Sequence, residues 1–417
     1  MNRPELLAPA GNLEKLKIAV LYGADAVYCG GFNFGLRAGA DNFSEEDLRA
    51  GADFAHQQGT RIYVTVNMIP HNDDLKELPD YLHKLEEIAV DGIIVSDPGV
   101  MRIADREGIS IPLHLSTQAN AVNWQSVLFW QELGLERIIL ARELSRQEVN
   151  EIKDRTDIEL EMFIHGAMCV SYSGRCLLSN YLTGRDANRG RCAHPCRWQY
   201  HLVEEKRPGE YYPVIEDSNG THILNSRDLC LIEHIPQIVE SGVDSLKIEG
   251  RMKGLHYTAA VTTIYRRALD QYLEKGRQNY HFNPDWLEEL KKISHRPYTT
   301  GFFVSEEENR EYTASSVYRS SFKFVGVVHG FSEGQIMELE VRNKIEKSDR
   351  LEVLTPAGEV FSFVVERIVN SGGEEVDSAP HPGEIIKITA GEIASTVNIP
   401  AYSLLRREKT GGNKHGK

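Results

Sequence analysis

The sequence predicts a (β/α)8 TIM-like barrel followed by a small C-terminal antiparallel β-barrel domain. Over residues 1–276, eight short segments rich in Val, Ile and Leu alternate with helix-length amphipathic segments. From residue 319 onward the helical pattern stops and only strand-like segments remain. A doubly wound open sheet is the alternative for the first part, but such a sheet has no need of eight strands at this regular spacing.

The predicted barrel strands are mostly apolar, as expected for parallel strands that are buried on both faces. They span residues 5–11, 25–31, 61–67, 91–99, 111–118, 137–144, 159–169 and 244–251. The helices between them include 44–59, for which Ser44 is the predicted N-cap. A long helix over 255–274 closes the barrel.

The regular spacing fails once, between the seventh and eighth strands, where a cysteine-rich insertion covers residues 169–240. Residues 277–318 are predicted to form a linker and barrel-closing segment, and residues 319–405 the β-barrel domain. The tail, 406–417, is polar and contains glycine, and it is predicted to be disordered. Because loops after the strand C-termini form the active face of a (β/α)8 barrel, the insertion lies where chemistry occurs in this fold.

The composition is that of a soluble globular protein, with 41% hydrophobic and 26% charged residues. The formal net charge of −14 argues against a protein that coats nucleic acid through its overall field. No apolar run approaches the ~18 residues of a membrane span, and the N-terminus lacks the pattern of a secretory signal. We therefore expect a cytoplasmic protein without membrane contact, whose thiols stay reduced.

Five of the six cysteines lie in the insertion, which indicates a thiolate-bound metal or iron–sulfur centre. They are Cys169, Cys176, Cys192, Cys196 and Cys230. Four thiolates can hold a [4Fe–4S] cluster or a structural zinc ion. The six residues between the first two cysteines are unusual for zinc, so the spacing favours iron–sulfur, although five candidates for four places leave the ligand set open. Cys29, inside a predicted strand, is interpreted as a small buried apolar side chain.

Polar side chains at the C-terminal ends of the predicted strands are candidates for catalysis and substrate binding, because a packed barrel core does not need them there. The catalytic candidates are His165, Asn67, Gln118 and Glu249. The substrate-binding candidates are Asp97, Arg142 and Arg251, together with Arg37 and Asn42 from the loop after the second strand. Any of these residues can instead cap a helix or order a loop, and His165 can be a structural histidine.

Arginines run through the insertion among the cysteines. A basic patch on an acidic protein localises a polyanion to one face, and four of these arginines are the candidates for binding the phosphates of a nucleic acid. They are Arg185, Arg189, Arg191 and Arg197. Scattered, solvated arginines are the alternative interpretation.

Several catalytic signatures are absent from the sequence. It contains no HExxH metalloprotease helix, no GxSxG nucleophile elbow, no P-loop and no GxGxxG. The CxxxCxxC motif of radical S-adenosylmethionine enzymes is absent too, so a cluster in this protein would be used in another way.

Four segments together resemble the peptidase U32 family. They are ELLAPAGNLEKLKIAVLYGADAVYCGG at the start, EMFIHGAMCVSYSGRCLLSNYLTGRDANRGRCAHPCRW, NSRDLC and SLKIEGRMK. The likeness extends over nearly the whole chain. The chain length and the single C-terminal β-domain are most similar to the branch of the family that hydroxylates tRNA.

The resemblance implies an oxygen-independent hydroxylase that forms 5-hydroxyuridine at the wobble position of tRNA, with prephenate as hydroxyl donor and a [4Fe–4S] cluster as cofactor. It implies four cluster ligands, Cys169, Cys176, Cys192 and Cys230, with Cys196 as a substitute. Two alternatives belong to other classes. One is the peptidase activity in the family name; the other is a non-catalytic metal-binding subunit that contacts RNA and has a paralogous protein as its partner.

Overall fold

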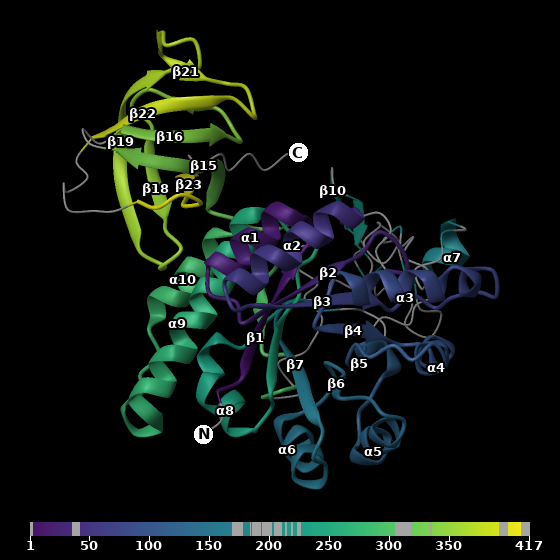
Figure 1. The fold of residues 1–417 in the computed structure, drawn as a ribbon. Coiled ribbons are helices and arrows are strands. Elements are labelled where there is room, and N and C mark those ends of the chain that lie inside the picture. Colours follow the sequence, from purple (N-terminus) through teal and green to yellow (C-terminus); the bar gives the residue numbers. More distant parts are fainter. Residues whose placement is uncertain are drawn as a thin grey trace.

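Eight parallel strands close into a barrel at the centre of the larger domain (Figure 1). They are β1 (Glu5–Ala10), β2 (Ala26–Gly30), β3 (Arg61–Val66), β4 (Gly92–Val95), β5 (Leu113–Leu115), β6 (Arg137–Ile139), β7 (Glu159–Ala167) and β13 (Ser245–Ile248). Each strand pairs with the next in sequence, and β13 pairs with both β1 and β7, which closes the ring. The predicted (β/α)8 barrel is confirmed, and all eight strands lie within the predicted segments.

The computed structural model describes most of the chain. The described residues are 3–35, 42–168, 178–183, 185, 193, 202–203, 211–212, 215–217, 220–222, 227–304, 318–332, 336–391 and 399–409.

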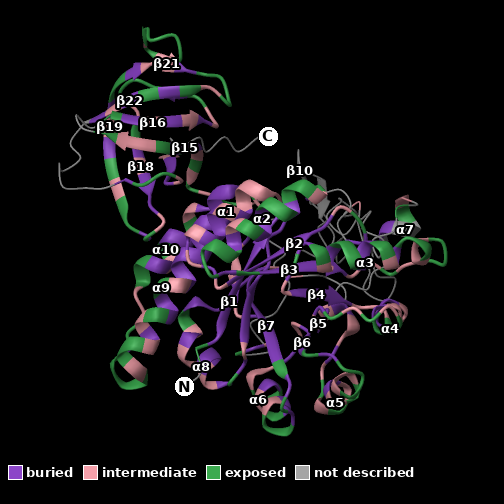
Figure 2. Ribbon diagram, viewed as in Figure 1, coloured by how far each residue is buried: buried purple, intermediate pink, exposed green. Residues whose placement is uncertain are grey.

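Helices surround the strands, with their apolar faces buried against the barrel (Figure 2). They are α1 (Leu13–Leu21), α2 (Glu45–Gln57), α3 (Leu78–Glu87), α4 (Pro98–Arg106), α5 (Trp124–Glu132), α6 (Arg146–Arg155), α8 (Ile235–Glu240) and α9 (Leu255–Asn279), with the short 3-10 helices η1 (Asp74–Lys76), η2 (Thr117–Ala119) and η6 (Ile232–His234). Ser44 caps α2 by accepting from the backbone N–H of Asp47, as predicted. Ser145 and Glu148 form a capping box at the start of α6.

The insertion between β7 and β13 adds one strand to the sheet, outside the closed ring of eight. Its described elements are α7 (Leu178–Thr183), β8 (Leu202–Val203), β9 (Tyr211–Tyr212), β10 (Ile215–Asp217), β11 (Gly220–His222) and β12 (Asp228–Cys230). Strand β12 runs antiparallel to the last residues of β7, with Cys230 opposite His165 and Asp228 opposite Ala167. The two ends of the insertion therefore meet beside the mouth of the barrel.

The pairing of β7 with β13 contains a bulge that changes the direction of one side chain. Lys247 pairs with Phe163, whereas Ile248 pairs with His165, so Ile164 is the extra residue. Glu161 and Phe163 contact Lys247, but His165 packs against α9. A single extra residue has thus turned His165 out of the barrel interior.

The stretch predicted as a linker, 277–318, contains regular structure. Helix α9 continues to Asn279, α10 (Pro284–Lys292) follows, and β14 (Tyr298–Thr299) adds to the sheet by pairing with β12. Asn283 caps α10 by accepting from the backbone N–H of Asp285, and Trp286 and Leu290 are buried on the face of α10 that packs against the barrel core. The sequence did not predict α10 because this helix is short and the residues around it are typical of turns, so its apolar positions give only a weak helical periodicity.

The C-terminal domain is a closed antiparallel β-barrel, as predicted. The predicted boundary at residue 405 is wrong, because the last strand extends to Glu408 and the predicted disordered tail, 406–417, therefore begins with ordered residues. Its strands are β15 (Phe322–Ser332), β16 (Ile336–Val341), β17 (Ile345–Glu346), β18 (Arg350–Leu354), β19 (Val360–Val369), β20 (Glu375–Val376), β21 (Ser378–Ala379), β22 (Ile385–Gly391) and β23 (Leu404–Glu408). Closure follows from the order β18-β23-β15-β16-β22-β19 with β18 also paired to β19. The domain has an apolar core of its own, and Figure 1 shows it beside α1, α9 and α10.

Candidate active site

The interior of the TIM barrel is charged along its axis, where barrels of this class mostly carry branched apolar side chains. Arg137 donates from Nη1 to Oε1 of Glu5 at 2.6 Å and to Oε2 of Glu161 at 3.3 Å. Lys247 donates from Nζ to Oε1 of Glu161 at 2.8 Å. These four side chains are at most 5% exposed, and we call them the axial ion network.

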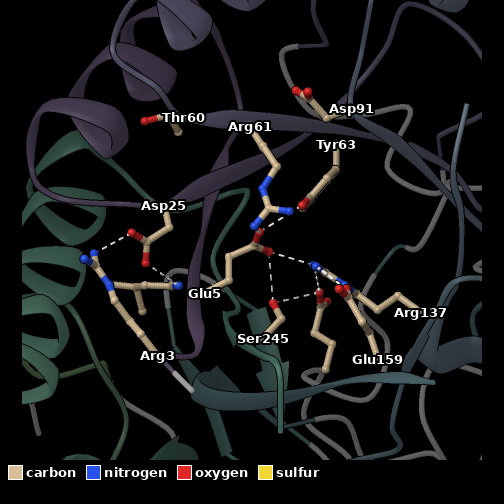
Figure 3. Close-up of polar contacts among 12 residues, drawn as sticks. Arg3, Glu5, Asp25, Thr60, Arg61, Tyr63, Asp91, Arg137, Glu159 and Ser245 are labelled. Atoms are coloured by element: carbon tan, nitrogen blue, oxygen red, sulfur yellow. Dashed lines mark hydrogen bonds and ion pairs between the residues drawn. The ribbon is translucent and has the colours of Figure 1, made fainter. Parts of the chain in front are cut away.

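Hydrogen bonds from neutral groups complete the axial ion network (Figure 3). Tyr63 donates from its hydroxyl to Oε2 of Glu5 at 2.9 Å, and Ser245 donates to Oε2 of Glu161 at 3.0 Å. Burial alone would raise the pKa of Glu161, but the charges of Lys247 and Arg137 hold that pKa below its usual range. The network is therefore a set of paired charges inside the barrel, fixed by its own hydrogen bonds.

An open depression of about 400 Å3 lies at the N-terminal ends of the strands, below the axial ion network. Two exposed arginines border it, and each is paired: Arg3 with Asp25, and Arg61 with Glu5 (Figure 3). Because active sites of this fold lie at the opposite, C-terminal end of the strands, we assign this depression no catalytic role.

Arg251 lies on one side of the barrel mouth, over the ends of β2 and β3. Its Nη1 donates to Oγ1 of Thr65 at 2.9 Å, and the side chain is 4% exposed. The guanidinium occupies the space above Gly30, where a β-carbon would lie 2.5 Å from Nη1 and 2.9 Å from Oδ1 of Asn42. The absence of a side chain at Gly30 therefore lets Arg251 and Asn42 come together, and their roles in substrate binding stay predictions.

Arg142 lies on the other side of the mouth, beside the end of β7. It donates from Nη1 to the carbonyl of Ala167, and its guanidinium carbon stands 3.9 Å from the centre of the Phe163 ring. In a closed ring of eight strands, β2 and β3 lie opposite β6 and β7. Two of the three predicted substrate-binding arginines, Arg142 and Arg251, thus stand on opposite sides of the same opening.

Two of the predicted catalytic residues meet between these arginines through a serine. Asn67 donates from Nδ2 to Oγ of Ser116 at 3.4 Å, and Oγ of Ser116 lies 3.4 Å from Oε1 of Gln118. Gln118 is 5% exposed, and Ser96 donates to the carbonyl of Asn67 at 3.0 Å. The ends of β3, β4 and β5 therefore carry a connected group of amides and hydroxyls.

Asp97 and Glu249 lie at strand ends but have structural contacts there. Asp97 is the N-cap of α4 and accepts from the backbone N–H of Gly99 at 2.8 Å. The backbone of Glu249 donates to the carbonyl of His165 at 2.8 Å and accepts from the hydroxyl of Tyr257 at 2.6 Å. Their roles toward a substrate stay predictions.

His165 is enclosed by tyrosines between β7 and α9. Its ring centre lies 5.4–5.9 Å from those of Tyr257, Tyr265 and Tyr298, and the side chain is 1% exposed. Burial, with the charges of Lys253 and His295, lowers the pKa of His165 to about 3, so the imidazole is neutral. This histidine faces α9 rather than the barrel axis, and its catalytic role stays a prediction.

Cys230 lies in the same enclosure, opposite His165 in the strand pairing. The thiol is buried, and this burial raises the pKa of Cys230 to about 12. A nucleophilic cysteine needs a lowered thiol pKa beside a protonated base. The neutral Cys230 and His165 pair has the opposite character, which does not support a cysteine peptidase built on these two residues.

The remaining predicted residues lie mostly outside the described residues. These are Arg37, Cys169, Cys176, Cys192, Cys196, Arg189, Arg191 and Arg197. Arg185 is described and exposed, and its carbonyl accepts from Oγ of Ser179 at 2.7 Å. Among the described residues, no three side chains of His, Cys, Asp or Glu gather as a metal site.

The sequence analysis missed the axial ion network and the tyrosines around His165. A signal for the first was present: Glu161 and Lys247 each interrupt an apolar strand, at a position that alternation directs inward. For the second, Tyr257 and Tyr265 stand eight residues apart on one face of α9. Neither signal says which strand or helix the residue would meet.

The fold and the polar mouth of the larger domain define a TIM-barrel protein with an appended β-barrel domain. Comparison with known proteins shows its family. The family described as Peptidase family U32 matches residues 11–313, and its C-terminal domain matches residues 320–406. The chain belongs to peptidase family U32. None of the described helices has the length and apolar character needed to cross a membrane.

Relatives with curated names match this chain over most of its length. It is 45% identical to "tRNA hydroxylation protein P1" of Bacillus subtilis, over 92% of this chain and 91% of the relative. It is 38% identical to "tRNA hydroxylation protein P" of Escherichia coli, with both chains covered completely. It is also 33% identical to "23S rRNA 5-hydroxycytidine C2501 synthase" of Escherichia coli, over 93% of this chain and 58% of the relative.

Proposed function

We propose that this protein is a tRNA hydroxylase that forms 5-hydroxyuridine at the wobble position, in the cytoplasm, with prephenate as hydroxyl donor and a [4Fe–4S] cluster as cofactor. The observation that carries the proposal is the identity of 38% to a tRNA hydroxylation protein over the full length of both chains. The relative that acts on ribosomal RNA is a hydroxylation enzyme too, which supports RNA hydroxylation as the common chemistry.

The barrel mouth suits a small anionic co-substrate. Arg251 and Arg142 stand on opposite sides of the opening, and prephenate carries two carboxylates, which guanidinium groups bind through charge-assisted hydrogen bonds. The amide and hydroxyl group formed by Asn67, Ser116 and Gln118 lies between them. Hydrogen bonds among these side chains already hold them in position, so they can bind and orient a ligand without rearranging.

The uracil base would enter the same opening from outside. A base inside a helical stack is unreachable, whereas the anticodon is single-stranded and its bases can be turned outward. Base edges are recognised by amides, and Asn67 and Gln118 provide these at the strand ends. Arg185 and the other arginines of the insertion are the proposed contacts to the RNA phosphates.

The cluster is proposed to bind Cys169, Cys176, Cys192 and Cys230, with Cys196 as a substitute ligand. The described member of this set fits the role, because Cys230 is a buried free thiol at the edge of the insertion. The cluster would supply a redox centre or a Lewis-acidic iron. A paralogous partner protein stays a prediction.

Nucleoside mass spectrometry of tRNA tests the function. An Escherichia coli strain that lacks its tRNA hydroxylation protein P and grows without oxygen should regain 5-hydroxyuridine-derived nucleosides when it expresses this chain. The Arg251→Met variant should restore about tenfold less or nothing, since one good charge-assisted contact contributes about 1.5–3 kcal/mol.

The control for this variant is Arg277→Met, which removes an exposed arginine paired with Glu240 far from the mouth and should leave the nucleoside level unchanged. Circular dichroism of both variants checks that the barrel is folded. Unmodified tRNA in the strain that expresses the native chain would contradict the proposal, and cleavage of a test protein by the purified chain would favour the peptidase alternative.

A further inference from the structure

A buried hydroxyl lies against the sulfur of Cys230 and has no part in the reaction proposed above. Tyr265 of α9 is fully buried, and its Oη stands 3.9 Å from Sγ of Cys230, within hydrogen-bonding range of a sulfur acceptor. A side-chain donor from α9 thus lies against this thiol.

The hydroxyl of Tyr265 is held in place from several sides. It accepts from the backbone N–H of Leu231 at 3.0 Å, next to Cys230 in the chain. Its proton has three acceptors within reach: the carbonyl of Ile164 at 2.8 Å, Nδ1 of His165 at 3.4 Å and Sγ of Cys230. With a neutral thiol, the nearest acceptor, the Ile164 carbonyl, holds the proton.

We propose that Tyr265 is a positioning residue that sets the reduction potential of the iron–sulfur centre by donating a hydrogen bond to Cys230. This inference rests on the proposed function, because it takes Cys230 as a cluster ligand. A cysteine that ligates iron is a thiolate, and hydrogen bonds to a charged acceptor are about twice as strong as bonds between neutral groups. The negative sulfur therefore competes with the carbonyl for the Tyr265 proton.

The direction of the effect follows from charge. A reduced cluster is more negative than an oxidised one, so a donor to its sulfur stabilises the reduced form more and raises the potential. Burial strengthens this effect, because Cys230 is buried and lies opposite His165, whose ring packs against those of Tyr257 and Tyr298. The carboxylates of Asp228 and Glu233 also act on this sulfur, and they are the same in every variant compared below.

The test compares variants of the intact chain, purified without oxygen and analysed for iron and acid-labile sulfide. Tyr265→Phe removes the donor and should lower the midpoint potential in a redox titration followed by electron paramagnetic resonance, with iron and sulfide contents unchanged. Tyr272→Phe is the matched control: it lies on the same helix, is fully buried and loses its hydrogen bond to Glu240, so its potential should equal that of the native chain.

A second substitution covers the case in which Tyr265→Phe fails to load or fold. Replacing Tyr265 alone by 3-fluorotyrosine keeps the hydroxyl and makes it a stronger donor, so the potential should rise. Loaded variants whose potential equals that of the native chain would overturn the role of Tyr265 while leaving the hydroxylase proposal intact. Zinc in place of iron and sulfide in the native chain would overturn the cluster itself and this inference with it.

Discussion

At the scale of residues, the unusual feature is a set of charges inside a barrel that most sequences fill with apolar groups. Removing two charges from water is costly, and their attraction offsets that cost only when geometry and hydrogen bonding are good. In the axial ion network, Glu161 satisfies this condition with three donors: Arg137, Ser245 and Lys247. The same arrangement holds Nζ of Lys247 4.3 Å from the centre of the Tyr28 ring and 5.7 Å from that of the Phe163 ring.

The Glu161→Gln variant tests the axial ion network. It keeps the shape of the side chain but leaves Lys247 buried without its negative partner, so it should lower the free energy of unfolding by about 3–5 kcal/mol. Urea unfolding followed by tryptophan fluorescence measures this. The control is Glu151→Gln, which removes an exposed pair with Arg155 and should change stability little. Equal stability of the two variants would show that the network contributes nothing to the fold.

At the scale of elements, the end of β7 decides how the insertion joins the barrel. The bulge at Ile164 turns His165 toward α9, and β12 pairs with the strand beyond it. Gly166 follows with a φ of +111°, a backbone conformation that residues other than glycine rarely adopt. A β-carbon at Gly166 would lie 2.4 Å from the carbonyl oxygen of Glu249, so the backbones of β7 and the segment after β13 touch there.

The Gly166→Ala variant tests this close approach. The new methyl group should push Glu249 and Arg251 away from the mouth, and the variant should lose both stability and tRNA hydroxylation. Gly59→Ala is the control, because Gly59 also has a positive φ, +72°, but no atom within 4 Å of the added carbon. That control should lose only the ~1–2 kcal/mol of the left-handed conformation. Hydroxylation that survives in Gly166→Ala would show that the contact does not position the mouth.

At the scale of the whole molecule, one buried arginine fixes the β-barrel domain to the TIM barrel. Arg406 of β23 has no exposed surface and pairs with Glu289 of α10, with Glu352 of β18 and with Nε2 of His256 of α9 at 3.2 Å. The Tyr22 hydroxyl lies 2.9 Å from the carbonyl oxygens of both Leu354 and Tyr402, either of which can accept its one proton. An interface with buried, paired charges and directional bonds holds one orientation of the two domains.

The Arg406→Met variant tests that attachment. It leaves the buried Glu289 with only Lys292 as a partner, so the domains should separate and the radius of gyration from small-angle scattering should increase. Arg367→Met removes an exposed ion pair with Glu375 on the same domain and should leave the radius unchanged. An unchanged radius in Arg406→Met would mean that the remaining contacts, among them the apolar packing of Leu354 and Leu404 and the hydrogen bonding of Tyr22, suffice to hold the domains.

The sequence by itself determined the eight barrel strands, the β-barrel domain and the strand-end residues, because hydrophobic periodicity and strand polarity are local signals. It also contained the cysteines that suggest a cluster. Only the tertiary structure decided which polar residues meet. The meeting of Arg251 with Thr65, the opposite position of Arg142 and the contact of Tyr265 with Cys230 all join residues distant in sequence. Such contacts depend on ring closure, one bulge and helix packing, and none of these is written in a local pattern.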